Sequence, residues 1–166
     1  MRLIKEVHKM NEIRICPIGK IVNGSDIKIV LNQKYAKALK GLDGFSHVQI
    51  LWWMGGCDNE DDRNVVVEEK PYKNGPDEMG VFALRSPERP NPIAVSNANI
   101  AYVDEKAGIV GVYYIDAFDG SQVLDLKPYT PSIDRVENPK TPGWCSHWPK
   151  SYEDNESFDW GAEFNF

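Results

Sequence analysis

The chain is divided into short apolar runs by Gly, Pro, Asn and Asp residues, and this spacing constrains the fold more than any other feature. The runs are rich in Ile, Val, Tyr and Phe, which are typical of strands. Short strands separated by frequent turns are typical of an all-β barrel. We therefore predict a mainly β protein, a small antiparallel barrel, with strands at Ile13–Val22, Ile27–Leu31, His47–Met54, Val65–Glu68, Gly80–Leu84, Ala94–Val103, Ile109–Ala117 and Val123–Leu126.

Helical sequence is scarce. One short helix is predicted over Lys34–Lys40, ended by Gly41 as its C-terminal cap. Polar segments at Asn23–Asp26 and Asp104–Gly108 have the residues of hairpin turns. The chain has no internal repeat and no G-x-G-x-x-G motif, which disfavours a doubly wound dinucleotide fold.

A chain of 166 residues with 42% hydrophobic content predicts one compact domain. No apolar run approaches the length of a membrane span, and the N-terminus is too charged for a secretory signal. The cysteines Cys16, Cys57 and Cys145 lie far apart, as expected for reduced thiols in a cytoplasmic protein. A zinc site from Cys145, His147 and distant partners is an alternative, but we expect no metal.

The composition of the sequence changes near residue 136, where the alternating apolar runs end. We predict a barrel domain over residues 1–135 and an irregular, Trp-rich and acidic extension over residues 136–166. Trp144 and Trp148 would cover the barrel or a neighbouring subunit. The alternative is that they form a wall of the substrate pocket.

A proline-rich run follows the predicted strand Gly80–Leu84. Three prolines within residues 87–92 stiffen the backbone, so the loop has little entropy left to lose on binding a ligand. Arg85 and Arg89 flank the first of these prolines, and Asn91 lies between the last two. The pattern indicates either an anion-binding loop at a strand end or a surface turn with solvated arginines.

A second landmark spans residues 116–129. Asp119 and Gly120 are typical of a tight turn, and an alternating stretch follows that ends at Lys127–Tyr129. Taken alone, this segment predicts an ordinary hairpin.

Three ordered motifs together resemble those of the TsaA-like (TrmO) family. They are Gly41–His47 (GLDGFSH), Gly80–Pro92 (GVFALRSPERPNP) and Asp116–Tyr129 (DAFDGSQVLDLKPY). The resemblance spans roughly Ile13 to Asp134. It implies a small antiparallel barrel that binds S-adenosylmethionine, unlike the Rossmann-type methyltransferases.

The residues and the resemblance indicate the same cofactor loops. A guanidinium of Arg85 or Arg89 can pair with the ligand's carboxylate, Asp119 can accept hydrogen bonds, and Gly120 permits close backbone approach. A hairpin aspartate with no ligand is the alternative for Asp119. The predicted cofactor site comprises Arg85, Ser86, Arg89, Pro90, Asn91, Phe118, Asp119, Gly120 and Ser121.

Methyl transfer depends on positioning the acceptor and requires no nucleophilic side chain, so no residue is assigned as the catalyst. Asn91 is one candidate, since Asn91-Pro92 resembles the Asn-Pro pair of amine methyltransferases of another fold. His47 is the other candidate, although its apolar surroundings are more typical of a core histidine than of a base.

Asp125, Lys127 and Tyr129 are spaced to point to one side of a strand. Either they contact the substrate, or Lys127 simply pairs with Asp125.

Following the resemblance, the acceptor would be the exocyclic amino nitrogen of a threonylcarbamoyl-modified adenosine beside the tRNA anticodon, and the protein would be a homodimer. The net charge of −6 argues against a broad RNA-binding face. The alternatives are a small-molecule acceptor or a non-catalytic S-adenosylmethionine-binding module.

The chain departs from the family pattern at several points. The connection Val22–Ile27 is too short to cover the cofactor, Trp52–Gly56 replaces a polar strand end, and Ala94 replaces a glycine. The chain also stops soon after the motifs, where bacterial tRNA enzymes continue into a further domain. We expect these differences to affect the acceptor more than the cofactor.

Overall fold

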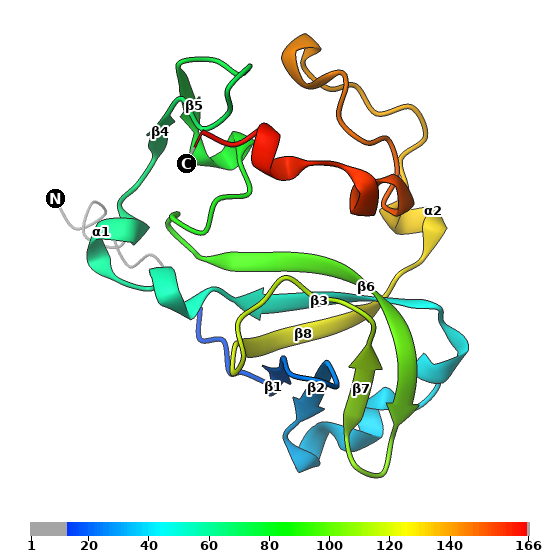
Figure 1. Ribbon diagram of the computed structural model, residues 1–166. Helices are drawn as coiled ribbons and strands as arrows, with labels where there is room; N and C mark the ends of the chain where they lie inside the picture. The colour runs from blue at the N-terminus through cyan, green and yellow to red at the C-terminus, as the bar shows by residue number, and fades with distance from the viewer. Residues whose placement is uncertain (1–12, 166) are drawn as a thin grey trace, which may run out of the picture.

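The computed structural model describes residues 13–165, which form a closed antiparallel barrel with two excursions on one side (Figure 1). The strand order is β1-β2-β7-β6-β3-β8, and β8 pairs back onto β1. This confirms the predicted mainly β barrel. Its strands are β1 (Gly19–Val22), β2 (Lys28–Leu31), β3 (His47–Trp53), β6 (Ile93–Asp104), β7 (Ile109–Val112) and β8 (Gln122–Pro128), while β4 (Val67–Glu69) and β5 (Glu78–Gly80) form a separate hairpin.

The helices are short. The segment predicted as a helix is a 3₁₀ helix at Gln33–Leu39, whose spacing of three places Ala36 and Leu39 in the interior. Gly41 then adopts φ of 86°, as a helix-ending glycine does. No helix within residues 13–165 is long and apolar enough to cross a membrane. The others are α1 (Glu60–Arg63), α2 (Pro131–Asp134) and 3₁₀ turns at Leu42–Gly44, Gly55–Cys57, Val81–Ala83, Gly143–Cys145, Glu153–Ser157 and Trp160–Ala162.

Strict alternation along β3 builds the barrel core. Val48, Ile50 and Trp52 are buried, while the residues between them lie on the outer face. Ile29 and Val110 meet them inside the barrel as part of one hydrophobic cluster. The period of two fixes which residues remain available on the outer face of β3.

The predicted strand Gly80–Leu84 is wrong. Strand β5 ends at Gly80, and Val81–Ala83 forms a 3₁₀ turn. Val81 and Leu84 are buried, whereas Phe82 is 87% exposed, a spacing of three that no strand can produce. The apolar residues of this run follow the period of a 3₁₀ turn, and their composition alone does not distinguish that period from the period of a strand.

Two other predicted strands are shorter than expected. The strand predicted at Ile109–Ala117 ends at Val112, because its neighbour β2 begins at Lys28, which pairs with Gly111. The strand predicted at Ile13–Val22 begins only at Gly19, two residues after Pro17, which has no N–H to donate to a ladder.

The two excursions, residues 54–92 and 130–165, lie together above the sheet formed by β6, β3 and β8 (Figure 1). Tyr72 of the first excursion packs its ring against Trp144 and Trp148 of the second, with centroids 5.2 and 5.0 Å apart. An isolated antiparallel bridge joins Tyr72 to Phe164. The tryptophans of the extension therefore cover the neighbouring excursion of the same chain.

A buried carboxylate links this aromatic cluster. Glu163 accepts a hydrogen bond from the Trp148 indole at 3.0 Å and is 2.8 Å from His147 Nε2. The Trp148 bond first, and the His147 bond second, lower the pKa of Glu163. The ionised carboxylate thus stabilises the folded extension.

Acid is expected to loosen the extension through Glu163. A lowered pKa gives stability that is complete above the unfolded value and is lost as the pH falls through the folded value, here below about pH 4.5. Tryptophan emission followed from neutral pH to about pH 3 should show a transition that Glu163→Gln reduces. An identical acid transition in Glu163→Gln would contradict the assignment.

Candidate functional site

The two motif loops meet at one end of the barrel. Trp53 at the end of β3 pairs with Ile93, the first residue of β6, and Trp52 pairs with Val123 near the start of β8. Residues 85–92 immediately precede β6, and residues 118–121 immediately precede β8. The end of β3 therefore brings together loops that are about thirty residues apart in sequence.

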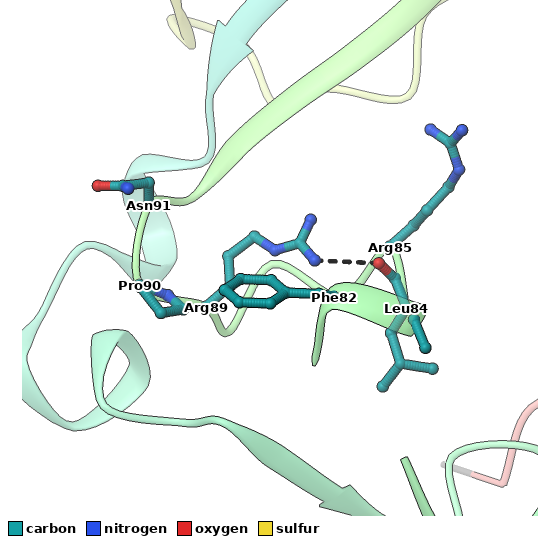
Figure 2. A pocket seen from close by; sticks show the side chains of 7 residues that line it. Phe82, Leu84, Arg85, Arg89, Pro90 and Asn91 are labelled. Carbon is teal, nitrogen blue, oxygen red and sulfur yellow. Dashed lines mark hydrogen bonds between the residues drawn. The ribbon is translucent and has the colours of Figure 1, made fainter. Parts of the chain in front are cut away.

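A cavity of about 500 Å³ opens at the first loop (Figure 2). This volume suits a small-molecule ligand. Aromatic, cationic and amide side chains line it, contributed by Phe82, Ala83, Leu84, Arg85, Arg89, Pro90 and Asn91.

Arg89 holds the loop from inside. Its Nη2 donates to the carbonyl oxygens of Val81 and, at 3.0 Å, Leu84 (Figure 2). Val81 begins the 3₁₀ turn that replaces the predicted strand, and Leu84 directly follows this turn. The Arg89 Nε is buried and has no hydrogen-bond partner among residues 13–165, so one strong donor beside the cavity is unsatisfied.

Arg85 is the exposed arginine of the pair. Its side chain points away from Arg89 (Figure 2), and it makes no hydrogen bond or ion pair within the described residues. Burial and the charge of Glu68 raise the pKa of the Tyr72 hydroxyl, and Arg85 partly offsets them. Arg85 thus provides an unpaired guanidinium at the edge of the cavity.

The second loop is tied to the first hairpin. Asp119 Oδ1 accepts the Asn23 backbone N–H at 3.0 Å, and Asn23 Nδ2 donates to the Ala117 carbonyl at 2.6 Å. Gly120 adopts φ of 82°, a value that favours glycine, and its N–H donates to Ile21. The short Val22–Ile27 connection therefore anchors this turn.

The ends of this turn differ in exposure. Phe118 is 84% exposed, and Ser121 closes the turn by donating its N–H to the Phe118 carbonyl at 3.1 Å. One Asp119 oxygen accepts the hydrogen bond from Asn23, as expected if Asp119 is a hairpin aspartate that stabilises the turn. The other oxygen has no hydrogen bond within residues 13–165 and remains available as an acceptor.

A network missed by sequence reasoning borders Asn91. Arg63 Nη1 pairs with Asp58 at 2.8 Å, and its Nη2 lies 3.5 Å from Asn91 Oδ1. The Trp53 indole donates to Asp58 at 3.0 Å, and the Arg63 guanidinium lies over the Trp53 ring. Hydrogen bonds from Arg63 and then Trp53 lower the pKa of Asp58. The sequence gives one indication of this network, namely Trp52-Trp53, which departs from the family pattern and contributes Trp53 to it.

The structure does not bring His47 to the cofactor loops. His47 begins β3 and Trp53 ends it, which separates His47 from Asn91 by about 20 Å of strand. Ser46 Oγ lies 2.9 Å from His47 Nδ1, and the ring stacks edge-on with Tyr129. The two catalytic candidates therefore lie at opposite ends of the barrel.

The predicted substrate residues follow β8 between these ends. Lys127 Nζ pairs with Asp125 Oδ2 at 2.7 Å, and this bond raises the pKa of Lys127. Asp125 and Lys127 lie opposite Leu51 and Gln49, on the outer face. Tyr129 follows at the His47 end.

Comparison with known proteins agrees with the motifs. The family model of the tRNA-methyltransferase O N-terminal domain matches residues 8–135. The chain belongs to this family. All three sequence motifs lie inside the TrmO-domain match, and residues 136–165 lie beyond it.

Two curated relatives illustrate the range of this family. An S-adenosyl-L-methionine-binding protein of Archaeoglobus fulgidus is 36% identical over 109 residues, which cover 66% of this chain and 73% of that protein. The tRNA (adenine(37)-N6)-methyltransferase of Escherichia coli is 35% identical over 114 residues, 68% of this chain and 47% of the enzyme. The chain therefore spans about half the length of the Escherichia coli relative.

The fold agrees with a solved TrmO structure. The two superpose with a TM-score of 0.63 at 26% identity, covering 78% of this chain and 63% of the TrmO chain. This likeness confirms the family barrel.

Proposed function

We propose that this TrmO-family protein is an S-adenosylmethionine-dependent methyltransferase. The observation that carries the proposal is the meeting of two loops at one barrel end, with the unpaired guanidinium of Arg85 on one and an open Asp119 oxygen on the other. The names of the relatives, a cofactor-binding protein and a methyltransferase, support the same assignment.

The residues present fit S-adenosylmethionine. The cofactor carries a carboxylate, for which Arg85 is a bidentate partner, and amino and diol groups, for which Asp119 is an acceptor. Exposed rings at Phe82 and Phe118 can face a cationic sulfonium. The unsatisfied Arg89 Nε is a further donor for the carboxylate or for a bridging water. When bound, the cofactor supplies an electrophilic methyl group.

The chain's contribution to the reaction is positioning. Pro90 and Pro92 hold the loop stiff, and Arg89 fixes it to the turn beneath. Asn91 lies at the mouth of the cavity, held near Arg63, where its amide can hydrogen-bond an incoming amino group. An acceptor nitrogen held about 3 Å from the methyl carbon requires no side-chain nucleophile.

For the acceptor, we propose the adenine amino nitrogen next to the tRNA anticodon, because the Escherichia coli relative is named as a tRNA (adenine(37)-N6)-methyltransferase. A small-molecule acceptor is the second candidate, because a net charge of −6 disfavours a broad phosphate-binding face. Labelled methyl transfer to tRNA that lacks the modification, followed by nucleoside mass spectrometry, distinguishes the two.

We also propose that the protein is a cytoplasmic homodimer. Phe82 and Phe118, both more than 80% exposed beside the cofactor loops, are the kind of apolar surface that a second copy would cover. Free thiols at Cys16, Cys57 and Cys145 suit a reducing compartment. Gel filtration with light scattering at micromolar concentration should give twice the mass of 18.8 kDa, and the monomer mass would contradict the dimer. Cell fractionation tests the compartment.

A further inference from the structure

A second and larger cavity lies at the opposite end of the barrel. Its volume is about 1220 Å³, and it is enclosed between the barrel surface and residues 131–153, most of which lie beyond the family match. We call it the extension cavity. Among its lining residues, His47, Asn97 and Tyr129 come from the barrel, and Arg135, Lys150 and Tyr152 come from the excursion after β8.

Three aromatic rings gather in the extension cavity. The His47 ring lies 6.3 Å from that of Tyr129 and 6.1 Å from that of Tyr152, at interplanar angles of 61° and 87°. In this T-shaped arrangement the edge of one ring meets the face of the other, so the rings are not stacked face to face. The ring faces that no neighbouring edge meets can stack with a planar ligand.

Several polar groups at this site are unpaired within residues 13–165. Gln49 Nε2 donates to Asn97 Oδ1 at 3.3 Å, so the Asn97 amide nitrogen makes no hydrogen bond within the described residues. Ser46 Oγ contacts His47 Nδ1, which leaves His47 Nε2 without a partner among these residues. The Arg135 guanidinium and the Tyr152 hydroxyl have no hydrogen-bond partner in this part of the chain. A tyrosine hydroxyl is protonated at neutral pH and can donate a hydrogen bond, and burial and then the charge of Glu153 raise the pKa of Tyr152 further.

We propose that the extension cavity binds one unpaired nucleotide of an RNA strand, with its base stacked on the Tyr152 ring and edge-on to the His47 ring, and with its phosphate at Arg135. Stacking on aromatic side chains and hydrogen bonds to base edges are how proteins recognise single-stranded RNA. Carboxylates of Glu137 and Glu153 also line the cavity, and they can accept from exocyclic amino groups. The Asp134 carboxylate is occupied by the Thr130 N–H at 2.7 Å.

The position of the cavity favours RNA over a free nucleotide. The cavity lies about 20 Å along β3 from the cofactor loops, so one RNA strand can reach both. Because a net charge of −6 weakens the attraction to phosphates, RNA bound at this site must gain its affinity mainly from contacts to the base. The RNA occupant rests on the proposed function, in which the acceptor is an RNA base.

The test compares binding of a fluorescently labelled anticodon stem-loop RNA to the wild type, Tyr152→Ala and Tyr152→Phe. Tyr152→Ala should weaken RNA binding about 5- to 150-fold, the range for losing one stacked base, while Tyr152→Phe retains the ring and most of the affinity. S-adenosylmethionine affinity, measured by calorimetry, should be unchanged in both variants. Arg135→Gln should weaken adenosine monophosphate more than adenosine.

The outcomes separate this inference from the proposed function. Equal RNA affinity in Tyr152→Ala and wild type would overturn the site, even if tRNA is methylated. Tyr152-dependent RNA binding without methyl transfer would retain the site and reject the activity. Tyr152-dependent binding of adenosine monophosphate, without RNA binding, would replace the RNA occupant by a free nucleotide.

Discussion

Replacing Arg85 with alanine should weaken S-adenosylmethionine binding by about 30- to 150-fold, the equivalent of about 2–3 kcal/mol for a lost charge-assisted hydrogen bond. Arg85 is exposed and has no partner within residues 13–165, so the substitution removes a ligand contact and leaves the fold intact. Isothermal calorimetry measures the affinity, and the free energy of unfolding should change by less than about 0.5 kcal/mol.

Lys127→Ala is the matched control for Arg85→Ala. It also removes one exposed cation, but Lys127 is paired with Asp125 on the outer face of β8, away from the cofactor loops. Its S-adenosylmethionine affinity should remain within about twofold of wild type, since exposed pairs contribute little. Equal losses of S-adenosylmethionine affinity in the two variants would show that net charge governs binding, and not a specific contact of the Arg85 guanidinium.

Replacing Arg89 with alanine should have the opposite profile, with a free energy of unfolding lower by about 2–4 kcal/mol. The substitution leaves the Val81 and Leu84 carbonyls without their charged donor and releases the turn beneath the loop. Cofactor binding should fall as a consequence of the loosened loop. Urea denaturation followed by tryptophan emission measures the effect.

The control for Arg89→Ala is Arg85→Ala, the same chemical change four residues earlier on the same loop. The stability losses should differ by at least about 1.5 kcal/mol, because only Arg89 bonds to the backbone. Arg89→Lys should restore part of the stability, since an ammonium can still reach a carbonyl. Similar stabilities of Arg85→Ala and Arg89→Ala would contradict the proposal that Arg89 stabilises the loop through the Val81 and Leu84 carbonyls.

The barrel was predictable because its strands carry local signals. The run His47–Trp53 is rich in β-branched and aromatic residues, which predicts a strand, but Leu51 and Trp53 are apolar on the outer face, so only the structure assigns the two faces. Turn residues separate each such run from the next. Strand ends were less predictable, since β7 stops where its partner β2 begins, and that pairing is not encoded within β7 itself.

The sequence predicts which loops form the candidate site, but it does not predict what each side chain in those loops contacts. The motifs placed Arg85 and Arg89 in one loop, yet only the three-dimensional turn shows that Arg89 faces the Val81 and Leu84 carbonyls while Arg85 is free. The Asp58–Arg63 pair lies in a charged run typical of a solvated surface, and its contact with Trp53 depends on tertiary structure.

The extension cavity was the least predictable feature. Its rings come from His47, Tyr129 and Tyr152, which are separated by more than twenty residues at every step. The extension has no hydrophobic periodicity of its own, and its packing is set by Tyr72 on the other excursion. Contacts between residues so far apart in the sequence produce no local sequence pattern.

The central claim is best tested by incubating the purified protein with labelled S-adenosylmethionine and total tRNA that lacks the methyl group, then digesting the tRNA to nucleosides for mass spectrometry. Label is expected on the amino nitrogen of the modified adenosine beside the anticodon, and Arg85→Ala should lose it. Cofactor binding without label in any tRNA nucleoside would contradict the claim.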